Sequence, residues 1–430
     1  MRILLANYRY FVSSGPERYL FNLMKILAEA GHTVMPFSIR YNQNAETPYS
    51  KYFVESLGTR DEVYFDQHRK SPQAFLKTLL RLFYSTQVES GIARMVEETQ
   101  PSIAYVLCYL RKLSPALLVG LKKKGVPIVV RLSDYGMFCP EQHCFRNSSP
   151  CTLCIGGNLL HSIRYKCVKQ GYSISLVNVL ATWYHRYKGF FDLIDVFVTT
   201  NPFMEEMMIK AGYPKERLCC IPTFTDTGTF YSIEELSNSG YILCVGRLDP
   251  PKGVEVLLDA MAVMKQNQMA RSPILKIAGT GHNKNYVQYL RNRVSELNLA
   301  DNVEFLGNVA SEQIPELYKG ALFSVLPALC FENLPNSLVE SFACGKPVVA
   351  SNIGSLARTI SDGVDGLLFR PGDVEDLADK IRVLIMDREL RGKLSRNCRE
   401  TAVKQFSPQA HMKKLMSLFE QLAKSAQRVI

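Results

Sequence analysis

Residues 241–264, "YILCVGRLDPPKGVEVLLDAMAVM", give the clearest indication of the fold of this chain. An apolar run ends at Gly246, a turn rich in glycine and proline follows, and apolar residues then recur at helical spacing. This order predicts one strand–turn–helix unit of a doubly wound sheet, in which ligands bind at the carboxyl ends of the strands. Arg247 and Lys252 flank the turn, so we expect both cations at that edge, where they can clamp a diphosphate. A solvated turn is the alternative.

The same alternation extends in both directions from this stretch. Short apolar runs read as strands and are separated by longer segments of helical period, which is typical of parallel sheets with crossover helices. The first half contributes the runs "RILLA", "TVMPFS", "SIAYVL", "PIVVRL" and "DVFVTT". The second half adds "ILKIAG", "NVEFLG", "FSVLPA", "PVVAS" and "GLLFR" after the opening run.

We therefore predict an α/β protein made of two facing doubly wound domains with a ligand cleft between them. The boundary is expected in "CCIPTFTDTGTFYSIEELSNSG", which has turn residues and no sustained period. The predicted parts are a first domain (1–221), a linker (222–240), a second domain (241–408) and a final helix that crosses back to the first domain (409–430).

Composition narrows the class of protein. The chain has 430 residues, 47% of them hydrophobic and 21% charged, so it can bury large cores. The opening "MRILLANY" reads as a strand rather than a secretory signal, and no run approaches the roughly 18 apolar residues of a membrane span. We expect a cytoplasmic protein, or one held on the inner face of a membrane. In that setting the 12 cysteines favour free thiols or metal ligands over disulfides.

The positive charge lies in the first half. Residues 1–200 contain 24 Lys and Arg against 14 Asp and Glu, a net charge of +10. The remaining residues contain 27 against 26, so they add only +1 to the total of +11. Such a surface attracts nucleic acid, anionic lipid or a phosphorylated substrate, although a solvated basic surface explains it equally. An amphipathic helix over residues 74–96 and the run "LKKKG" (121–125) are the predicted lipid contacts. A core-facing helix would show the same apolar stripe.

Two glutamates stand in the stretch "CFENLPNSLVESFACGKPVVAS", residues 330–351. Pro335 suits a first helical turn and Gly345 a helix end, so Glu332 is expected in the preceding loop and Glu340 inside the helix. The start of a helix presents unpaired N–H groups to phosphate or sugar oxygens. The two carboxylates can accept hydrogen bonds from hydroxyl groups of a long polar ligand. A helix cap or a chance surface pair is the alternative.

Five segments of the second half resemble the retaining glycosyltransferases of family 4, which have the GT-B fold. They are "VGRLDPPKGVEVLLDA", "LKIAGTGHNKNYVQYL", "VEFLGNVASEQIPELY", "FENLPNSLVESFACGKPVVASNIG" and "DGVDGLLFRPGDVEDLADKI". The resemblance implies transfer of a hexosyl unit from a nucleoside diphosphate sugar to a saccharide or lipid-linked saccharide, in cell-surface polysaccharide biosynthesis. It implies retention of the anomeric configuration.

The resemblance also implies roles for individual residues. Arg247 and Lys252 neutralise the diphosphate, Glu332 holds the hydroxyls of the donor sugar, and these three form the implied catalytic set. The implied donor-binding set is Gly15, Gly246, Gly279, Asn333, Leu334, Pro335, Asn336 and Glu340, in which Glu340 binds the ribose. With cations supplied by the chain, no metal or other cofactor is expected in the reaction.

The first half resembles the family more loosely. "SSGPERYLFNLMKILAEAGHTV" is similar to its opening glycine loop and helix, with Pro16 in place of the usual second glycine while Gly15 remains. "PIVVRLSDYGMFCP" is similar to the strand end at which many members have histidine followed by aspartate. Here Ser133 and Asp134 occupy these positions, so the histidine's role does not carry over, and both are expected on the acceptor side.

A cysteine-rich insert over residues 139–167 follows, and it resembles an insert of some polysaccharide-assembly members. Four thiolates at this spacing can hold a structural zinc ion, and Cys144 is then surplus. The alternative is a loop of reduced thiols packed as small apolar groups. The predicted ligands are Cys139, Cys151, Cys154 and Cys167.

Two other functions compete with glycosyl transfer. A sugar-nucleotide epimerase or a phosphorylase has the same fold, and a phosphorylase would need a lysine-bound pyridoxal cofactor. A basic zinc-bearing nucleic-acid-binding protein would explain the charge and the cysteines but would leave the glutamate motif without a role. We therefore expect no nucleic-acid partner.

Overall fold

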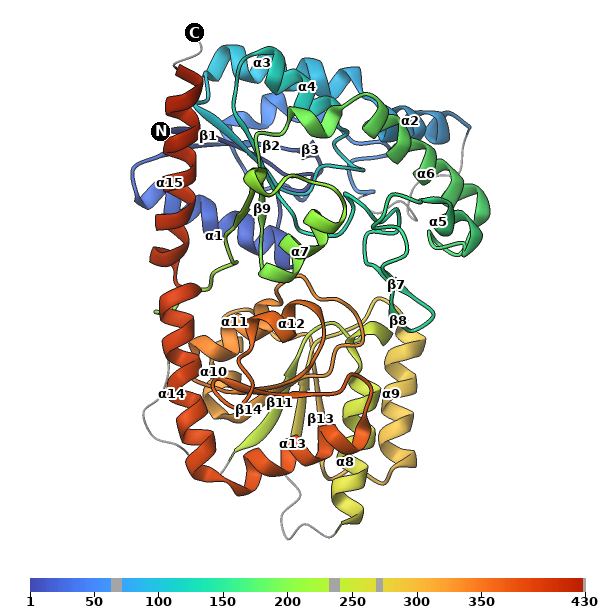
Figure 1. Cartoon of the computed structure of the whole chain (residues 1–430), viewed down its shortest axis with the longest axis vertical. Helices are drawn as coiled ribbons and strands as arrows, with labels where there is room; N and C mark the ends of the chain where they lie inside the picture. The colour runs from blue at the N-terminus through green and yellow to red at the C-terminus, as the bar shows by residue number, and fades with distance from the viewer. Residues whose placement is uncertain (63–71, 232–239, 268–273, 428–430) are drawn as a thin grey trace.

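The computed structural model describes residues 1–62, 72–231, 240–267 and 274–427. Within these residues the chain forms two six-stranded sheets, one above the other along the longest axis of the molecule (Figure 1). Each sheet is parallel throughout and has helices on its faces. The predicted α/β fold with two Rossmann-like domains is confirmed.

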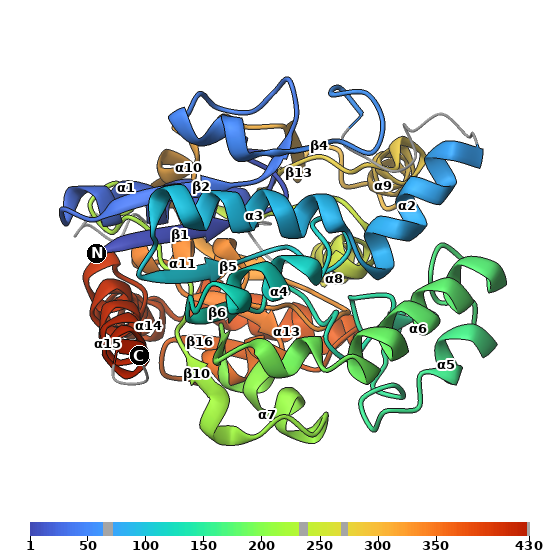
Figure 2. The same cartoon turned by 90° about the horizontal axis from the view of Figure 1, so that it is seen from above.

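The first sheet has the strand order β10-β9-β6-β5-β1-β2. Its strands are β1 (Arg2–Ala6), β2 (Thr33–Phe37), β5 (Ile103–Val106), β6 (Ile128–Arg131), β9 (Val196–Thr199) and β10 (Leu218–Cys220). Its helices are α1 (Gly15–Glu29), α2 (Pro72–Phe83), α3 (Thr86–Thr99), α4 (Ala116–Lys123), α5 (Leu160–Arg164), α6 (Tyr172–Tyr187) and α7 (Pro202–Lys210). Figure 2 shows α2, α5 and α6 gathered at one end of this domain.

Small elements lie outside the two large sheets. They are the parallel pair β3 (Ile39–Arg40) and β4 (Val54–Glu55), and the hairpin β7 (Phe145–Arg146) and β8 (Ser149–Pro150). Short 3₁₀ turns cover Pro48–Tyr52, Phe190–Leu193, Lys215–Arg217 and Pro250–Lys252. The hairpin belongs to the cysteine-rich insert.

The second sheet has the order β13-β12-β11-β14-β15-β16. Its strands are β11 (Tyr241–Val245), β12 (Leu275–Ala278), β13 (Val303–Gly307), β14 (Ala321–Leu326), β15 (Val348–Ser351) and β16 (Gly366–Phe369). Its helices are α8 (Val254–Gln266), α9 (Lys284–Glu296), α10 (Ile314–Gly320), α11 (Asn336–Ala343), α12 (Gly354–Thr359), α13 (Val374–Met386) and α14 (Arg388–Gln405). The chain winds outward from β11 in one direction and returns to β14 on its other side, so the topological switch point lies between these two strands.

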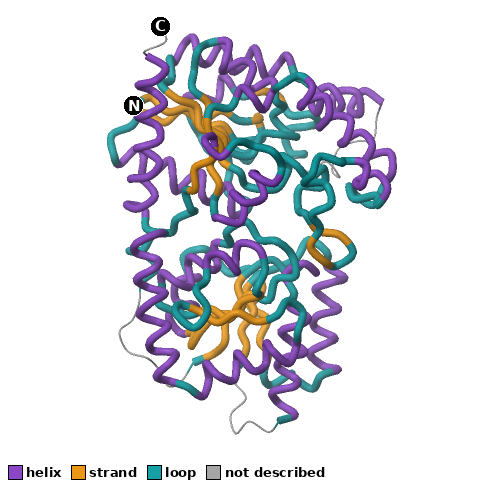
Figure 3. Tube along the Cα trace, in the orientation of Figure 1, coloured by secondary structure: helices purple, strands orange, loops and turns teal. Residues whose placement is uncertain are grey.

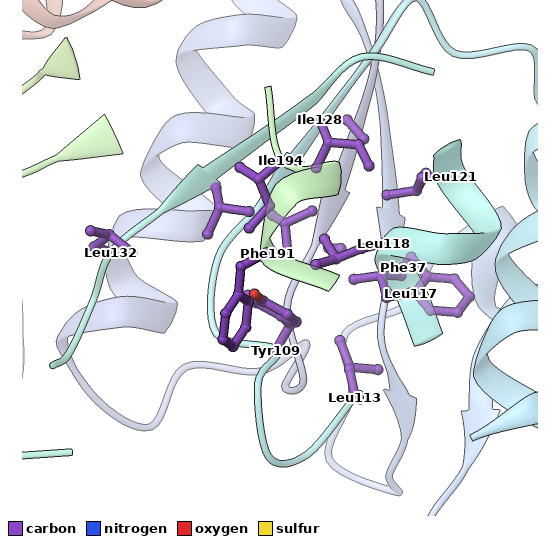
Figure 4. Close-up of a cluster of buried hydrophobic side chains, with 14 of the residues drawn as sticks. Phe37, Tyr109, Leu113, Leu117, Leu118, Leu121, Ile128, Leu132, Phe191 and Ile194 are labelled. Carbon is purple, nitrogen blue, oxygen red and sulfur yellow. The ribbon is translucent and has the colours of Figure 1, made fainter. Parts of the chain in front are cut away.

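Apolar side chains fill both faces of the first sheet. Figure 4 shows one of these cores, in which Leu117 and Leu118 of α4 lie with Phe37 of β2 and Ile128 of β6. All four are fully buried, and truncating such a leucine to alanine typically costs about 2–5 kcal/mol of stability. This rigid layer holds the strand ends that form the cleft.

Helix α14 runs along the second domain. The last helix, α15 (Pro408–Gln427), continues from it and packs on the first domain (Figures 1 and 3). Phe419 is fully buried against Tyr105 of β5, with ring centroids 5.4 Å apart. His411 accepts a hydrogen bond from the Tyr19 hydroxyl at Nε2 (3.0 Å) and donates from Nδ1 to the carbonyl of Pro222 (2.8 Å). Because a carbonyl can only accept, these contacts assign the neutral Nδ1–H tautomer.

The prediction of one amphipathic helix over residues 74–96 is wrong. The segment forms two helices, α2 and α3, separated at Tyr84 and Ser85. The Ser85 hydroxyl accepts a hydrogen bond from the Val88 N–H and caps α3. Val88, Ile92 and Met95 of α3 are fully buried, so this half is a core-facing helix.

Candidate active site

A deep cleft lies between the two domains. Its volume is about 1160 Å³, which is just above the range of about 300–1,000 Å³ for typical ligand pockets. Every sequence-predicted donor-side and acceptor-side residue lines it, namely Gly15, Ser133, Asp134, Gly246, Arg247, Lys252, Gly279, Glu332, Asn333, Leu334, Pro335, Asn336 and Glu340. The space accommodates two substrates.

Sheet topology explains why these residues meet. Arg247 and Lys252 follow β11, and Glu332 follows β14, the two strands that flank the switch point. Their carboxyl ends diverge into helices on opposite faces, which opens a crevice at that edge. The loop after β14 then leads into α11, which carries Glu340.

Lys252 forms an ion pair with Glu332 inside the cleft. The side chains are 26% and 14% exposed, so water screens the pair only partly. Burial by itself would lower the pKa of Lys252, but the charge and the hydrogen bond of Glu332 outweigh burial and raise it. The ammonium group therefore stays charged over the physiological pH range.

Arg247 lies nearer the cleft opening. Its side chain is 55% exposed, and its Nη1 lies 3.1 Å from the Asp249 carboxylate. Arg247 and Lys252 both line the cleft, and each cation is paired with a carboxylate. A diphosphate entering here would meet both cations together with the Asp249 and Glu332 carboxylates that pair with them.

Glu340 is buried in α11 and has a partner from the other domain. Arg18 Nη1 of α1 lies 3.1 Å from Glu340 Oε1. Burial raises the pKa of Glu340, while the Arg18 charge acts in the opposite direction. A cation therefore offsets the cost of burying each glutamate. The sequence analysis did not identify Arg18 as a site residue. The only feature that could have indicated it is its position one helical turn after Gly15.

The first turns of α1 and α11 face each other across the cleft. A Cβ atom at Gly15 would lie 3.3 Å from Asn336 Nδ2. Both helices direct their N-terminal ends, where unpaired N–H groups gather, toward the same space. Such ends favour a phosphate group in the cleft beside them.

The loop that carries Glu332 is anchored to the first domain. Asn333 Nδ2 donates to the Leu132 carbonyl (2.9 Å), and Asn201 Nδ2 donates to the Asn333 carbonyl (2.8 Å). The Tyr135 hydroxyl donates to the Glu332 carbonyl (3.0 Å). No motif in the sequence indicated Asn201 or Tyr135, because their role appears only when the domains face each other.

Gly279 has a steric reason to be glycine. Its φ is +144°, and a Cβ atom there would lie 1.9 Å from the Gly246 carbonyl oxygen. The turns after β11 and β12 therefore pack backbone against backbone. Any larger residue at position 279 would push the Arg247 turn out of place.

Ser133 and Asp134 lie just beyond the carboxyl end of β6. The Ser133 hydroxyl accepts a hydrogen bond from Arg131 Nη1 (3.2 Å), and Asp134 Oδ1 accepts one from the Gly136 N–H (2.7 Å). Burial raises the pKa of Asp134. These two residues form part of the cleft wall on the first domain.

The cysteine-rich insert forms a separate small cavity. The four predicted ligands Cys139, Cys151, Cys154 and Cys167 line it, and Cys144, which we had taken as surplus, lines it as well. A hydrogen bond from Cys144 lowers the pKa of Cys139 to about 6. In the described part of the chain, no three His, Cys, Asp or Glu side chains are placed to hold a metal ion as they stand. The zinc site stays a prediction.

The insert also shapes the cleft. Glu141 and Phe145 line both the cysteine cavity and the large cleft. His143 lies on the same loop, and the neighbouring Glu141 raises its pKa to about 8. The insert therefore forms part of the cleft wall on the first domain.

Two doubly wound parallel sheets with a cleft across their switch points define the GT-B class of fold. Residues 231–401, which span the second domain, match the family described as "Glycosyl transferases group 1". The chain resembles the sucrose-phosphate synthase of Thermosynechococcus elongatus over 99% of both chains, with a TM-score of 0.71 and 19% identity. It also resembles the Anabaena protein HepE in complex with UDP, over 98% of this chain and 100% of that one, with a TM-score of 0.68 and 18% identity.

Curated relatives match over shorter stretches. The chain is 28% identical over 240 residues to a mannosylfructose-phosphate synthase of Agrobacterium fabrum, which is 53% of each chain. It is 34% identical over 153 residues to a D-inositol 3-phosphate glycosyltransferase of Geodermatophilus obscurus, which is 35% of this chain and 34% of the relative. The alignments thus span a third to about half of these relatives.

Proposed function

We propose that this protein is a retaining glycosyltransferase that moves a hexosyl unit from a nucleoside diphosphate sugar to a saccharide or lipid-linked saccharide, in cell-surface polysaccharide biosynthesis. The observation that carries the proposal is the cleft at the β11/β14 switch point, where Arg247 and Lys252 lie with Glu332. The match of residues 231–401 to group 1 glycosyl transferases supports it. Solved neighbours with bound UDP and UDP-glucose make uridine diphosphate sugars the first donors to test.

The proposed chemistry depends on charge at the leaving group. Breaking the bond between the anomeric carbon and the diphosphate puts negative charge on the departing oxygen, and Lys252 and Arg247 stabilise that charge. The facing N-terminal ends of α1 and α11 add to the positive field. The acceptor attacks from the leaving-group side, and the diphosphate takes its proton.

Glu332 and Glu340 orient the donor in this proposal. Glu332 accepts hydrogen bonds from the sugar hydroxyls, and Glu340 accepts them from the ribose. Asp134 and Ser133, on the opposite wall, bind the acceptor. Holding both substrates in one cleft supplies proximity and excludes water that would hydrolyse the donor.

The proposed location is the cytoplasm, with attachment to the inner face of the membrane. Over the described residues, no helix is both long enough and apolar enough to cross a bilayer. A lipid-linked acceptor would require contact with the membrane surface.

A thermal-shift screen of nucleoside diphosphates and their sugars tests the proposal, because a ligand that binds only the folded state raises its melting temperature. We expect one nucleotide class to raise the temperature and Lys252→Ala to abolish the rise. Arg382→Ala, a paired surface cation on α13, serves as the control and should keep it. A screen in which no nucleotide stabilises the wild type would refute the proposal.

A further inference from the structure

Exposed apolar side chains concentrate at one end of the first domain. Of the twenty large hydrophobic side chains that are strongly exposed in the described chain, eleven lie within residues 75–80 and 153–187. These segments form α2, α5, α6 and the adjoining loops, which lie side by side in Figures 1 and 2. We call this surface the α2–α6 edge. Exposed apolar side chains gathered at one end of a domain indicate an interaction site.

Helix α6 carries the centre of the edge. Tyr172, Leu176, Leu180, Trp183 and Tyr187 are all exposed, and their spacing of four, four, three and four residues places them on one stripe. The opposite side of α6 is buried against the domain. The stripe is therefore not used to fold the domain.

Positive charge surrounds the stripe. Residues 142–191 contain six Lys and Arg and no Asp or Glu. Lys166 lies 4.5 Å from the ring centre of Tyr172, and Lys188 lies 5.8 Å from that of Tyr187. Aromatic, aliphatic and cationic side chains on one surface match the headgroup region of an anionic bilayer.

The lysine run Lys122–Lys124, which the sequence predicted to contact lipid, instead forms ion pairs within the domain. Lys122 pairs with Asp195 at 2.8 Å and Lys123 pairs with Glu89 at 2.7 Å, while Lys124 pairs with Glu97. Each lysine charge is matched by a carboxylate, which weakens any attraction to lipid phosphates. The lipid-facing surface is therefore assigned to a different part of the domain.

We propose that the α2–α6 edge binds the surface of an anionic lipid bilayer, with the α6 stripe among the headgroups and the flanking cations on lipid phosphates. Helix α5 of this edge belongs to the cysteine-rich insert, and Glu141 and Phe145 of the same insert line the cleft. Docking at the edge therefore brings the proposed acceptor side of the cleft toward the membrane. The link to a lipid-linked acceptor rests on the proposed function. The docking itself does not.

The chain provides its own reporter, since Trp183 is the only tryptophan and stands on the stripe. Vesicles of phosphatidylcholine with about 30% phosphatidylglycerol should shift Trp183 emission to the blue, and brominated lipid should quench it. Neutral vesicles should give a much weaker response, and salt should reduce the anionic one. Neither donor nor acceptor is present, so the readout is independent of transfer.

Matched variants locate the contact. Leu176→Gln combined with Leu180→Gln should weaken vesicle binding about tenfold or more, because both exposed side chains lose their apolar contact. Lys166→Gln should weaken it about fivefold. Val383→Gln combined with Met386→Gln changes exposed apolar residues on α13 of the second domain and should bind like the wild type.

Three outcomes would overturn the proposal. They are an unchanged Trp183 emission with anionic vesicles, unchanged binding by the stripe variant, and a stripe variant that dissociates a dimer while still binding vesicles. An unchanged melting temperature shows that the stripe variant is folded. Failure of the nucleotide screen would remove the proposed function and leave vesicle binding intact, so the two failures are distinguishable.

Discussion

Arg18 and Glu340 are 322 residues apart in the chain and meet across the cleft, with Arg18 Nη1 3.1 Å from Glu340 Oε1. One belongs to the first turn of α1 and the other to α11, so the ion pair joins the two domains. A ligand that uses the Glu340 carboxylate must share it with Arg18 or displace it. In the proposed function, donor binding and the relative position of the domains are therefore coupled through this pair.

Removing Arg18 should make nucleotide binding depend on pH. Burial already raises the pKa of Glu340, and Arg18→Ala removes the charge that opposes this shift. A protonated Glu340 accepts hydrogen bonds poorly, so we expect affinity for the nucleotide found in the screen to fall about tenfold at pH 6 and less at pH 8. Titration calorimetry measures both values. Lys25→Ala, an exposed change on the same helix, is the control, and identical pH profiles would contradict the coupling.

Breaking the Lys252–Glu332 pair should reduce turnover. Lys252→Ala removes a charge that stabilises the leaving diphosphate, and we expect kcat to fall by about 10²–10³. Glu332→Ala should also lower kcat strongly, since the donor sugar loses its orientation. Steady-state kinetics with circular dichroism checks rate and fold together. Near-normal turnover in either folded variant would count against the assignment.

His411 should make the protein less stable in mild acid. Burial lowers the pKa of His411 to about 3, below its ordinary value of 6.5. Because the folded pKa is the lower one, the neutral form stabilises the fold above pH 6.5, and this contribution is lost as pH falls toward 3. Between pH 7.5 and 5 the loss amounts to about 2 kcal/mol. Urea unfolding at both pH values measures it.

The control for this prediction is His411→Gln, which keeps polar groups near Tyr19 and Pro222 but cannot gain the proton. It should start less stable and show a smaller pH dependence than the wild type. An equal slope in both proteins would show that other groups cause the acid sensitivity.

Elemental analysis decides the zinc prediction. Protein purified without chelators should contain about one zinc ion per chain, since four thiolates suffice for a structural site. Cys151→Ser combined with Cys154→Ser should then lose the metal and melt at a lower temperature. Cys244→Ser, in the core of the second domain, should keep the metal. Purified wild-type protein that contains no zinc would refute the prediction of a zinc site.

Local patterns determined much of this molecule. The strand–turn–helix unit at residues 241–264 and the alternation around it predicted both sheets, because the period of buried side chains follows directly from backbone geometry. The same local logic placed Glu332 in a loop and Glu340 inside a helix, as observed. It failed at Ser85, where a capping hydroxyl divides a continuous apolar stripe into two helices.

Contacts between groups far apart in the chain could be found only in the folded molecule. Arg18 as the partner of Glu340, Asn201 as the anchor of the Asn333 loop, and Cys144 as a fifth thiol in the cysteine cavity depend on how the domains and the insert fold together. The folded molecule also shows that the α6 stripe stays exposed and that Lys122–Lys124 are paired. The physical reason is that sequence periodicity reports the local backbone, whereas burial and charge pairing depend on contacts between residues far apart in the chain.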